Sequence, residues 1–283
     1  MAQRKRKIWR LVIYVGFYSV ALMILGIILF PFVDLFFSSF KSLPEFGKYP
    51  PHLFPKRFSL QNYEYLFRLG SFGRVLFNSI LVASFVTVLS LLIGSIAAFS
   101  IARFRFRGQS ALSKFILFVY MFPSVLLVTP LFITIRSLGL VDSLWSLILA
   151  DTTFALPFSI WMLVGFFSSI PKQLDEAARI DGCTHGQVLW RIIVPLARPG
   201  IAAAGAFSFL LSWSEFVFAI TFIQSSQNRT LSAELLSLVG YASNMRPGVI
   251  IAGCVLAVVP VYILFLIIQR HIVDGLTLGA VKS

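Results

Sequence analysis

Long apolar segments separated by short polar ones are the dominant pattern along this chain of 283 residues. A helix that crosses a hydrocarbon core of about 30 Å needs about 20 mostly apolar residues, and lipid offers no partner to an unbonded backbone amide. Six segments meet this requirement: about Leu11 to Leu35, Val75 to Ile101, Leu112 to Ile135, Leu144 to Phe167, Gly200 to Ile223 and Val249 to Ile268. The pattern therefore predicts an all-α membrane protein with six transmembrane helices.

Lysine and arginine residues in the connecting segments predict the orientation of these spans. They are concentrated before the first span, between the second and third, between the fourth and fifth, and after the sixth. Short segments rich in basic residues face the cytoplasm, so both termini are expected there. We predict a basic cytoplasmic N-terminus (1–10), a transmembrane domain (11–268) with a cytoplasmic insertion at about 171–195, and a cytoplasmic tail (269–283). The proline-rich loop at 40–74 is expected to be an ordered lid on the other side.

Composition narrows the class of protein. Hydrophobic residues make up 58% of the chain, aromatic residues 15% and charged residues only 12%, which excludes a soluble protein and suits lipid contact. The net charge of +13 forms no extended basic domain, so we expect no nucleic-acid partner. Two distant cysteines and three scattered histidines predict neither a disulfide nor a metal site. A phosphate-binding GxxxxGK[ST] run is absent from the sequence, so the chain itself cannot hold ATP through a P-loop.

A short amphipathic helix is predicted in the insertion, from Pro171 to Gly182. Proline suits the first helical turn, and glycine readily adopts the left-handed conformation that ends a helix. One face carries mostly small side chains that would let another protein approach closely: Leu174, Ala177, Ala178 and Asp181. Two i,i+4 pairs, Lys172 with Glu176 and Asp175 with Arg179, are expected to support the helix weakly. So short a helix must dock on something, and periodicity alone favours the membrane surface over a partner protein.

The spacing of residues in this insertion is more specific than its periodicity. Glu176-Ala177-Ala178 is followed by Gly182 and then by the run Ile192-Ile-Val-Pro195. This spacing resembles the EAA motif of permease subunits in ABC importers, with valine where the pattern has leucine. Further similar segments are Leu60-Gln-Asn-Tyr63, Phe77-Asn-Ser79, Leu138-Gly-Leu-Val-Asp-Ser143 and Trp213-Ser-Glu-Phe216. Over nearly its whole length the chain resembles the maltose-permease type of carbohydrate importer, in the binding-protein-dependent transport system inner membrane component family.

This resemblance implies the type I ABC importer permease fold and a non-catalytic permease subunit with no cofactor of its own. It implies a prokaryotic inner membrane and four kinds of contact: a second, non-identical permease, two cytoplasmic ATPase subunits carrying ATP and Mg²⁺, an extracytoplasmic sugar-binding protein, and lipid.

In similar permeases the EAA segment forms a coupling helix in a cleft of the ATPase, and its glutamate faces a basic partner. The coupling residues that the resemblance implies are Glu176, Ala177, Ala178, Arg179, Asp181, Gly182, Ile192 and Pro195. The C-terminal tail resembles a segment that reaches between the two ATPases. Its implied contact residues are Gln269, Arg270, Gly275, Leu276, Thr277 and Gly279.

Acidic residues at or within apolar spans indicate a second candidate site. Asp34, Asp151 and Glu215 would each be costly to ionise in lipid unless they face a cavity or a partner. Glu215 follows Trp213 and Ser214, and an aromatic ring beside polar groups suits a sugar, whose faces stack and whose hydroxyls need hydrogen bonds. We expect the substrate path at Asp151, Trp213, Ser214 and Glu215. For Glu215, a structural bond to another helix or to the partner permease remains equally open. For Asp151, pore lining and a helix-terminal cap both remain open.

The expected function is import of a disaccharide or oligosaccharide of the maltose or trehalose type along an alternating-access path. Within the family, the alternative is another polar solute such as glycerol phosphate, although its anionic groups should favour basic residues that the spans almost lack. From a different class, the alternative is a proton-coupled carrier with Asp34, Asp151 and Glu215 as a relay. A membrane enzyme is disfavoured because the sequence shows no nucleophile–base or metal constellation.

Overall fold

The computed structural model describes residues 2–68, 72–240 and 247–280, but not the side chains of residues 2–8, 10–12, 240 and 270–280. All regular elements in these ranges are helices. Up to the middle of the chain they are α1 (Ala2–Ser38), α2 (Leu43–Phe46), α3 (Gln61–Arg68), α4 (Phe72–Arg103), α5 (Gln109–Tyr120), the 3₁₀ turn η1 (Ser124–Leu127), α6 (Val128–Ser137) and α7 (Leu144–Ser169). They continue as α8 (Gln173–Ile180), α9 (His185–Val188), the π segment η2 (Leu189–Ile193), α10 (Val194–Leu196), α11 (Arg198–Trp213), α12 (Val217–Phe222), α13 (Leu231–Gly240) and α14 (Pro247–Ala280).

Four of these helices are long and apolar enough to cross a membrane. They are α1 over Ile13–Ser38, α4, α7, and α14 over Pro247–Gln269. Two bent pairs of helices are broken spans or re-entrant loops: α5 with Ser124–Ser137 at 89°, and His185–Leu196 with α11 at 84°. The prediction of an all-α membrane protein is confirmed, with four to six candidate spans among the described residues.

The predicted fifth span is wrong as one continuous helix. α11 ends at Trp213 and α12 begins only at Val217. The carboxylate of Glu215 accepts hydrogen bonds from the backbone N–H groups of Phe218, at 2.7 Å, and Ala219, at 3.0 Å. These N–H groups have no partner inside a helix that begins at Val217, so the carboxylate stabilises the start of α12. A hydropathy pattern does not detect such a side-chain cap, so it predicts one continuous helix where the structure has α11 and α12.

The chain forms two compact units, Met1–Leu69 with Leu238–Leu256, and Gly70–Ser237 with Ala257–Ser283. In the first unit the loop after α1 is tied to α3. The side-chain amide of Asn62 donates to the backbone carbonyls of Ser39, at 2.8 Å, and Lys41, at 2.9 Å. These bonds hold the N-terminal part of the 40–74 loop in one conformation.

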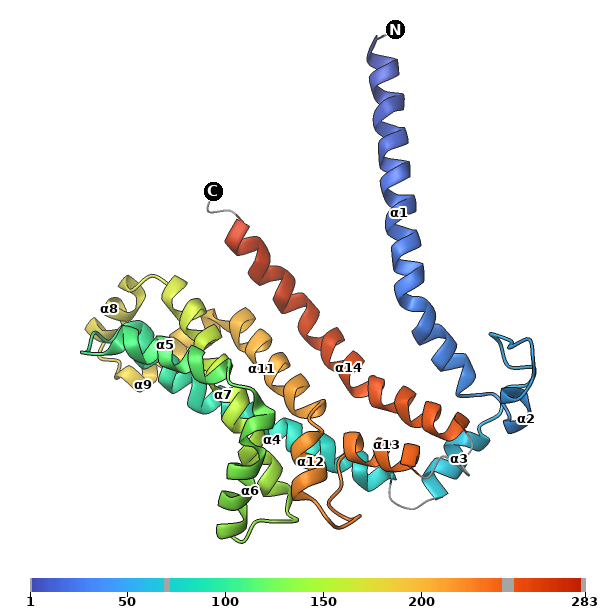
Figure 1. The fold of residues 1–283 in the computed structure, drawn as a ribbon. Helices are drawn as coiled ribbons and strands as arrows, with labels where there is room; N and C mark the ends of the chain where they lie inside the picture. The colour runs from blue at the N-terminus through green and yellow to red at the C-terminus, as the bar shows by residue number, and fades with distance from the viewer. Residues whose placement is uncertain (1, 69–71, 241–246, 281–283) are drawn as a thin grey trace. The chain divides into compact units, whose positions relative to one another are not determined.

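In the second unit α4, α7 and α11 pack against one another (Figure 1). The helices approach closely because small residues line their contacts: a Cβ atom built on Gly94 of α4 would lie 3.5 Å from the Cβ of Ser159 on α7. The hydroxyls of Ser159 and Ser208 form a buried hydrogen bond of 2.9 Å between α7 and α11. This packed bundle carries α8 near one of its ends and the 222–230 loop near the other.

Candidate functional site

Helix α8 forms where the insertion predicts it. Asp175 and Glu176 lie in its first turn, where negative charge is favourable. Gly182 follows the helix with φ of +86°, a left-handed conformation that is strained for other residues. The N–H of Gly182 donates to the carbonyl of Arg179, at 3.1 Å, and the N–H of Cys183 to the carbonyl of Ala178, at 2.9 Å. This bonding pattern terminates the helix, and it confirms the stop predicted at Gly182.

The face of small side chains predicted on α8 is divided by the structure. Ala178 is only 6% exposed and packs in a cluster with residues of α4, α7 and η2. Ala177 and Glu176 are exposed, and Ile180 is 87% exposed. The surface that α8 leaves free is therefore built around Glu176, Ala177 and Ile180. Sequence reasoning missed Ile180, although an isoleucine next to two charged positions on a short helix was the signal.

Asp175 makes a different ion pair from the one predicted. Its Oδ2 lies 2.7 Å from the Nε of Arg103, the last residue of α4. The predicted pairs Asp175–Arg179 and Lys172–Glu176 do not occur within 4.0 Å among the described side chains. Burial raises the pKa of Asp175, while the nearby charges of Arg103 and Lys172 act in the opposite direction. A buried cation competes better for a half-buried carboxylate than an exposed neighbour on the same helix.

The rest of the motif connects α8 to the bundle. Ile193 is fully buried in the same cluster as Ala178, and Ile192 packs against this cluster. The helix widens to a π segment just before Pro195, whose nitrogen has no hydrogen to donate. Ile192 and Pro195 thus lie in the segment that joins α8 to α11 and are partly buried in the bundle. If they contribute to coupling as predicted, they do so by holding α8 in place.

The C-terminal tail continues α14 as a helix as far as Ala280. Gln269 is exposed and its side-chain amide donates to the carbonyl of Leu266, at 3.2 Å. The other predicted tail contacts are residues whose side chains lie outside the description: Arg270, Gly275, Leu276, Thr277 and Gly279. Their role at an ATPase stays a prediction.

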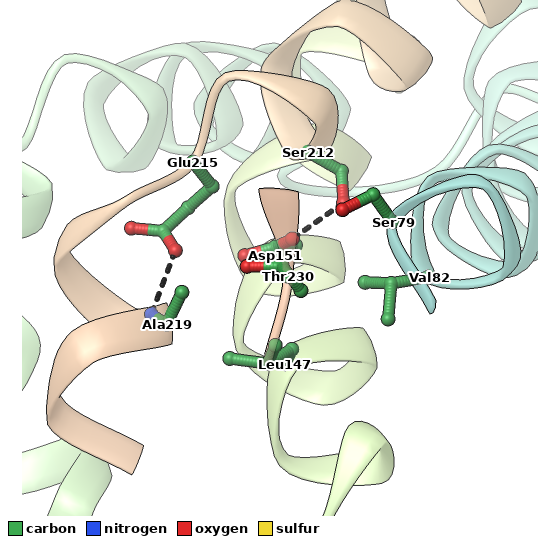
Figure 2. Close-up of a pocket in the computed structure, with 8 residues that line it drawn as sticks. All are labelled: Ser79, Val82, Leu147, Asp151, Ser212, Glu215, Ala219 and Thr230. Carbon is green, nitrogen blue, oxygen red and sulfur yellow. Dashed lines mark hydrogen bonds between the residues drawn. The ribbon is translucent and has the colours of Figure 1, made fainter. Parts of the chain in front are cut away.

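A buried polar cluster connects α7 to the end of α11. Figure 2 shows Asp151 of α7 beside Ser212, whose hydroxyl donates to Oδ2 of Asp151 at 2.5 Å. Asp151 is 2% exposed, and its Oδ1 has no hydrogen-bond partner among the described residues. With Ser79, Thr230 and Glu215 these side chains line a cavity of about 10 Å³, close to the smallest space that holds one water molecule. Asp151 therefore connects two helices at a site that is large enough for one water molecule but not for a sugar.

Glu215 also lines a larger cavity, of about 390 Å³, within the size range of small-molecule sites. Half of its lining residues are aromatic: the lining comprises Tyr120, Phe122, Ser124, Phe154, Leu211, Ser214, Glu215, Phe216, Val217 and Phe218. Of the residues predicted for the substrate path, Ser214 and Glu215 line this cavity. The sequence analysis did not identify the aromatic side chains from α5, α7 and α12.

Two of the residues singled out from the sequence do not line either cavity. Trp213 stacks on Phe209, with ring centroids 5.7 Å apart and planes at 12°. Asp34, in the other compact unit, lies 3.9 Å from the ammonium of Lys41. A direct contact of Trp213 with substrate therefore stays a prediction that this geometry does not support.

At the opposite end of α7 from α8, a loop at 222–231 is held by two of the matched sequence segments. Asp142 adopts φ of +60°, and its Oδ1 accepts hydrogen bonds from the backbone N–H groups of Gln224 and Ser225, both at 2.9 Å. The amide of Asn78 donates to the carbonyls of Gln227 and Arg229, at 2.9 and 3.0 Å. The loop conformation is thus fixed by side chains from α4 and from the turn before α7.

Replacing Asp142 by alanine is expected to free this loop. The backbone N–H of Ser225 is the main cause that lowers the pKa of Asp142, so the carboxylate is ionised at neutral pH and its bonds weaken only below its ordinary pKa. Hydrogen exchange of residues 224–228 should accelerate about 10-fold in the alanine variant, in line with hydrogen bonds to a charged group. Asp142→Asn keeps an acceptor and tolerates positive φ, so a smaller acceleration is expected. Equal exchange in wild type and Asp142→Ala would contradict this role.

The chain is similar to known transport proteins over most of its length. Residues 90–277 match the family described as binding-protein-dependent transport system inner membrane component. The chain is 38% identical over 264 residues to the trehalose transport system permease protein SugB of Mycobacterium tuberculosis, covering 92% of this chain and 95% of that protein. It is 34% identical over 282 residues to the trehalose/maltose transport system permease protein MalG of Thermococcus litoralis, covering 99% of both.

A solved structure shares the fold. It is a bacterial ABC transporter involved in the import of the acidic polysaccharide alginate, with a TM-score of 0.78 and 23% identity, covering 91% of this chain and 96% of that one.

Proposed function

The chain belongs to the binding-protein-dependent transport system inner membrane component family, and we propose that it is a permease subunit that forms half of the membrane path of an ATP-driven importer of a disaccharide or short oligosaccharide. The observation that carries this proposal is α8, a short helix at one end of the bundle whose ends, spacing and exposed Glu176 fit a docking surface for a motor subunit. The protein itself catalyses no covalent reaction.

The shape of α8 supports ATP-driven coupling. A solvated connector would be expected to hide its apolar side chains, but Ile180 is 87% exposed next to the exposed Glu176. A single exposed apolar residue is ordinary on a protein surface, so Ile180 supports docking only together with the spacing of the EAA segment. We propose that the α8 end of the bundle is cytoplasmic, as the basic residues predict, and that this surface docks on a cytoplasmic ATPase.

The cavity of about 390 Å³ supports a carbohydrate substrate. Aromatic rings that are not fully buried, such as those of Tyr120, Phe122 and Phe216, can stack on sugar rings, and Ser214 and Glu215 can bond hydroxyl groups. No basic residue lines this cavity among the described side chains, which disfavours a phosphorylated solute. The names of the two relatives point to trehalose and maltose, which are neutral disaccharides.

The remaining partners are part of this proposal. A second, non-identical permease would form the other half of the path. An extracytoplasmic binding protein would deliver the sugar at the other end of the bundle, where the 222–231 loop is fixed by Asp142 and Asn78.

The proposal is tested with the whole transporter in inside-out and right-side-out vesicles, using radiolabelled trehalose, maltose and glycerol 3-phosphate. Uptake of at least one disaccharide should require ATP on the α8 side and the binding protein on the other, and should persist in the presence of a protonophore. Uptake that survives ATP removal and stops with the protonophore would support the proton-coupled carrier in place of this function. Uptake of glycerol 3-phosphate alone would overturn the choice of substrate.

Removing residues 275–283 is expected to weaken the complex. If the tail reaches between the ATPases, the truncated protein should still insert in the membrane but retain fewer ATPase subunits and lose at least half of its sugar-stimulated ATP hydrolysis. Co-purification and ATPase assays measure both effects. Wild-type values for both would exclude the tail contact.

A further inference from the structure

We propose that the buried ion pair between Arg103 and Asp175 is the positioning contact that makes α8 move together with α4 and α7. The inference rests on the proposed coupling function, and it assigns a role to two residues outside the predicted docking surface. Arg103 ends α4, and Asp175 lies in the first turn of α8.

The contacts of Arg103 connect three helices. Its Nε lies 2.7 Å from Oδ2 of Asp175, and its Nη1 donates to the backbone carbonyl of Ile170, which ends α7, at 3.1 Å. The Arg103 side chain is 4% exposed and the Asp175 side chain 15% exposed. One guanidinium therefore holds both ends of the short connection from α7 to α8 against the end of α4.

Few other contacts fix the orientation of α8. Ala178 is the α8 residue that is buried, and it is too small to resist rotation of the helix by itself. A cavity of about 170 Å³ lies between α8 and the end of α4, lined among others by Phe99, Arg103 and Asp175. Across this space the ion pair is the charged contact between α8 and α4. Without it we expect α8 to turn about Ala178 while α4 and α7 stay in place.

The pair is poorly explained as a source of stability. Nε and Nη2 of Arg103 and Oδ1 of Asp175 are buried and form no hydrogen bond among the described residues, although Nε lies 2.7 Å from Oδ2 of Asp175. A buried ion pair with unbonded atoms contributes little net stability, and apolar side chains of similar volume often do as well or better. What this pair supplies is a short, fixed distance between two helices that we propose move as one body.

The test separates positioning from stability in the complete transporter reconstituted in proteoliposomes. Arg103→Gln and Asp175→Asn each leave one buried charge unpaired, and each should lower the amount of assembled complex. The double variant Arg103→Gln/Asp175→Asn has no unpaired charge, so its assembly should return to within about twofold of wild type. Its ratio of ATP hydrolysed to sugar transported should nevertheless rise at least fivefold. A double variant with the wild-type ratio would overturn the positioning role.

A second variant keeps the test decisive if the double variant does not assemble. Arg103→Lys keeps the charge but cannot contact Asp175 and the Ile170 carbonyl with two rigidly joined nitrogens. Its assembly should be close to wild type and its ATP-to-sugar ratio at least twofold higher; an unchanged ratio would also overturn the proposal.

The control and the coupling function itself are tested in parallel. Glu64→Gln/Arg68→Gln removes an exposed ion pair of 3.9 Å on α3 and should leave the ratio unchanged. If Glu176→Lys uncouples transport while the Arg103 and Asp175 variants keep the wild-type ratio, only the positioning inference fails. If Glu176→Lys has no effect either, the proposed coupling function fails first.

Discussion

Replacing Glu176 by lysine is expected to reduce ATP-driven sugar uptake at least 100-fold while the protein still inserts in the membrane. The side chain is exposed on α8, and its helix neighbours Asp175 and Ala178 make the contacts to the bundle. Reversing its charge should therefore leave the permease fold intact but place like charges against a basic ATPase partner. A desolvated charge at an interface is worth about 2–5 kcal/mol when its partner is lost, which corresponds to at least 30-fold in affinity, and reversal adds repulsion.

Uptake in vesicles, membrane insertion and co-purification of the ATPase measure the three consequences of this change. Ile180→Asp should give a similar loss, because it places a charge in the apolar part of the same surface. Glu64→Lys, the same substitution at an exposed position on α3, is the matched control and should retain uptake. Wild-type uptake in Glu176→Lys would remove the evidence that α8 is the coupling element.

The local features of α8 were predictable because each depends on residues close in sequence. Gly182 ends the helix because glycine adopts the left-handed backbone conformation without strain. Apolar residues of the following segment then pack in the core. The direction of each side chain was harder to predict. Asp175 and Glu176 are adjacent carboxylates, but successive helical residues point about 100° apart, so one pairs inward with Arg103 and the other stays exposed.

Contacts between distant segments account for what the sequence could not give. Arg103 and Asp175 are 72 positions apart, and an i,i+4 partner was the only pairing that spacing could propose. The aromatic lining of the larger cavity comes from α5, α7, α12 and the segments beside them, whose side chains look like ordinary lipid-facing residues in a hydropathy pattern. The break between α11 and α12 depends on one carboxylate bonding backbone groups three and four residues later.

The structure also changes how the acidic residues of the spans are interpreted. Sequence reasoning treated Asp151 and Glu215 alike, as costly charges that face a cavity or a partner. Asp151 lies in the small cavity with Ser212, whereas Glu215 borders both the small and the large cavity. The carboxylate of Glu215 caps α12, which is a structural role, and it also borders the larger cavity, where contact with a sugar stays a prediction.

Variants of Glu215 are expected to separate these two roles. Glu215→Ala leaves the N–H groups of Phe218 and Ala219 without their acceptor and removes a hydrogen-bond partner from the sugar cavity. We expect the KM for the disaccharide to rise about 10- to 100-fold, as for a lost bond to a charged group, and the melting temperature of the complex to fall. Glu215→Gln removes the charge, so its KM should rise about 10-fold. It keeps one acceptor oxygen for the cap, so its melting temperature should change much less.

Uptake kinetics and thermal unfolding of the purified complex give the two readouts for each variant. Glu64→Gln makes the same chemical change at an exposed site and should alter neither. A lower melting temperature with an unchanged KM in Glu215→Ala would mean that the carboxylate only supports the break between α11 and α12. If both values stay at wild type, Glu215 neither contacts the sugar nor stabilises α12, and the substrate path must be sought among the other side chains that line the larger cavity.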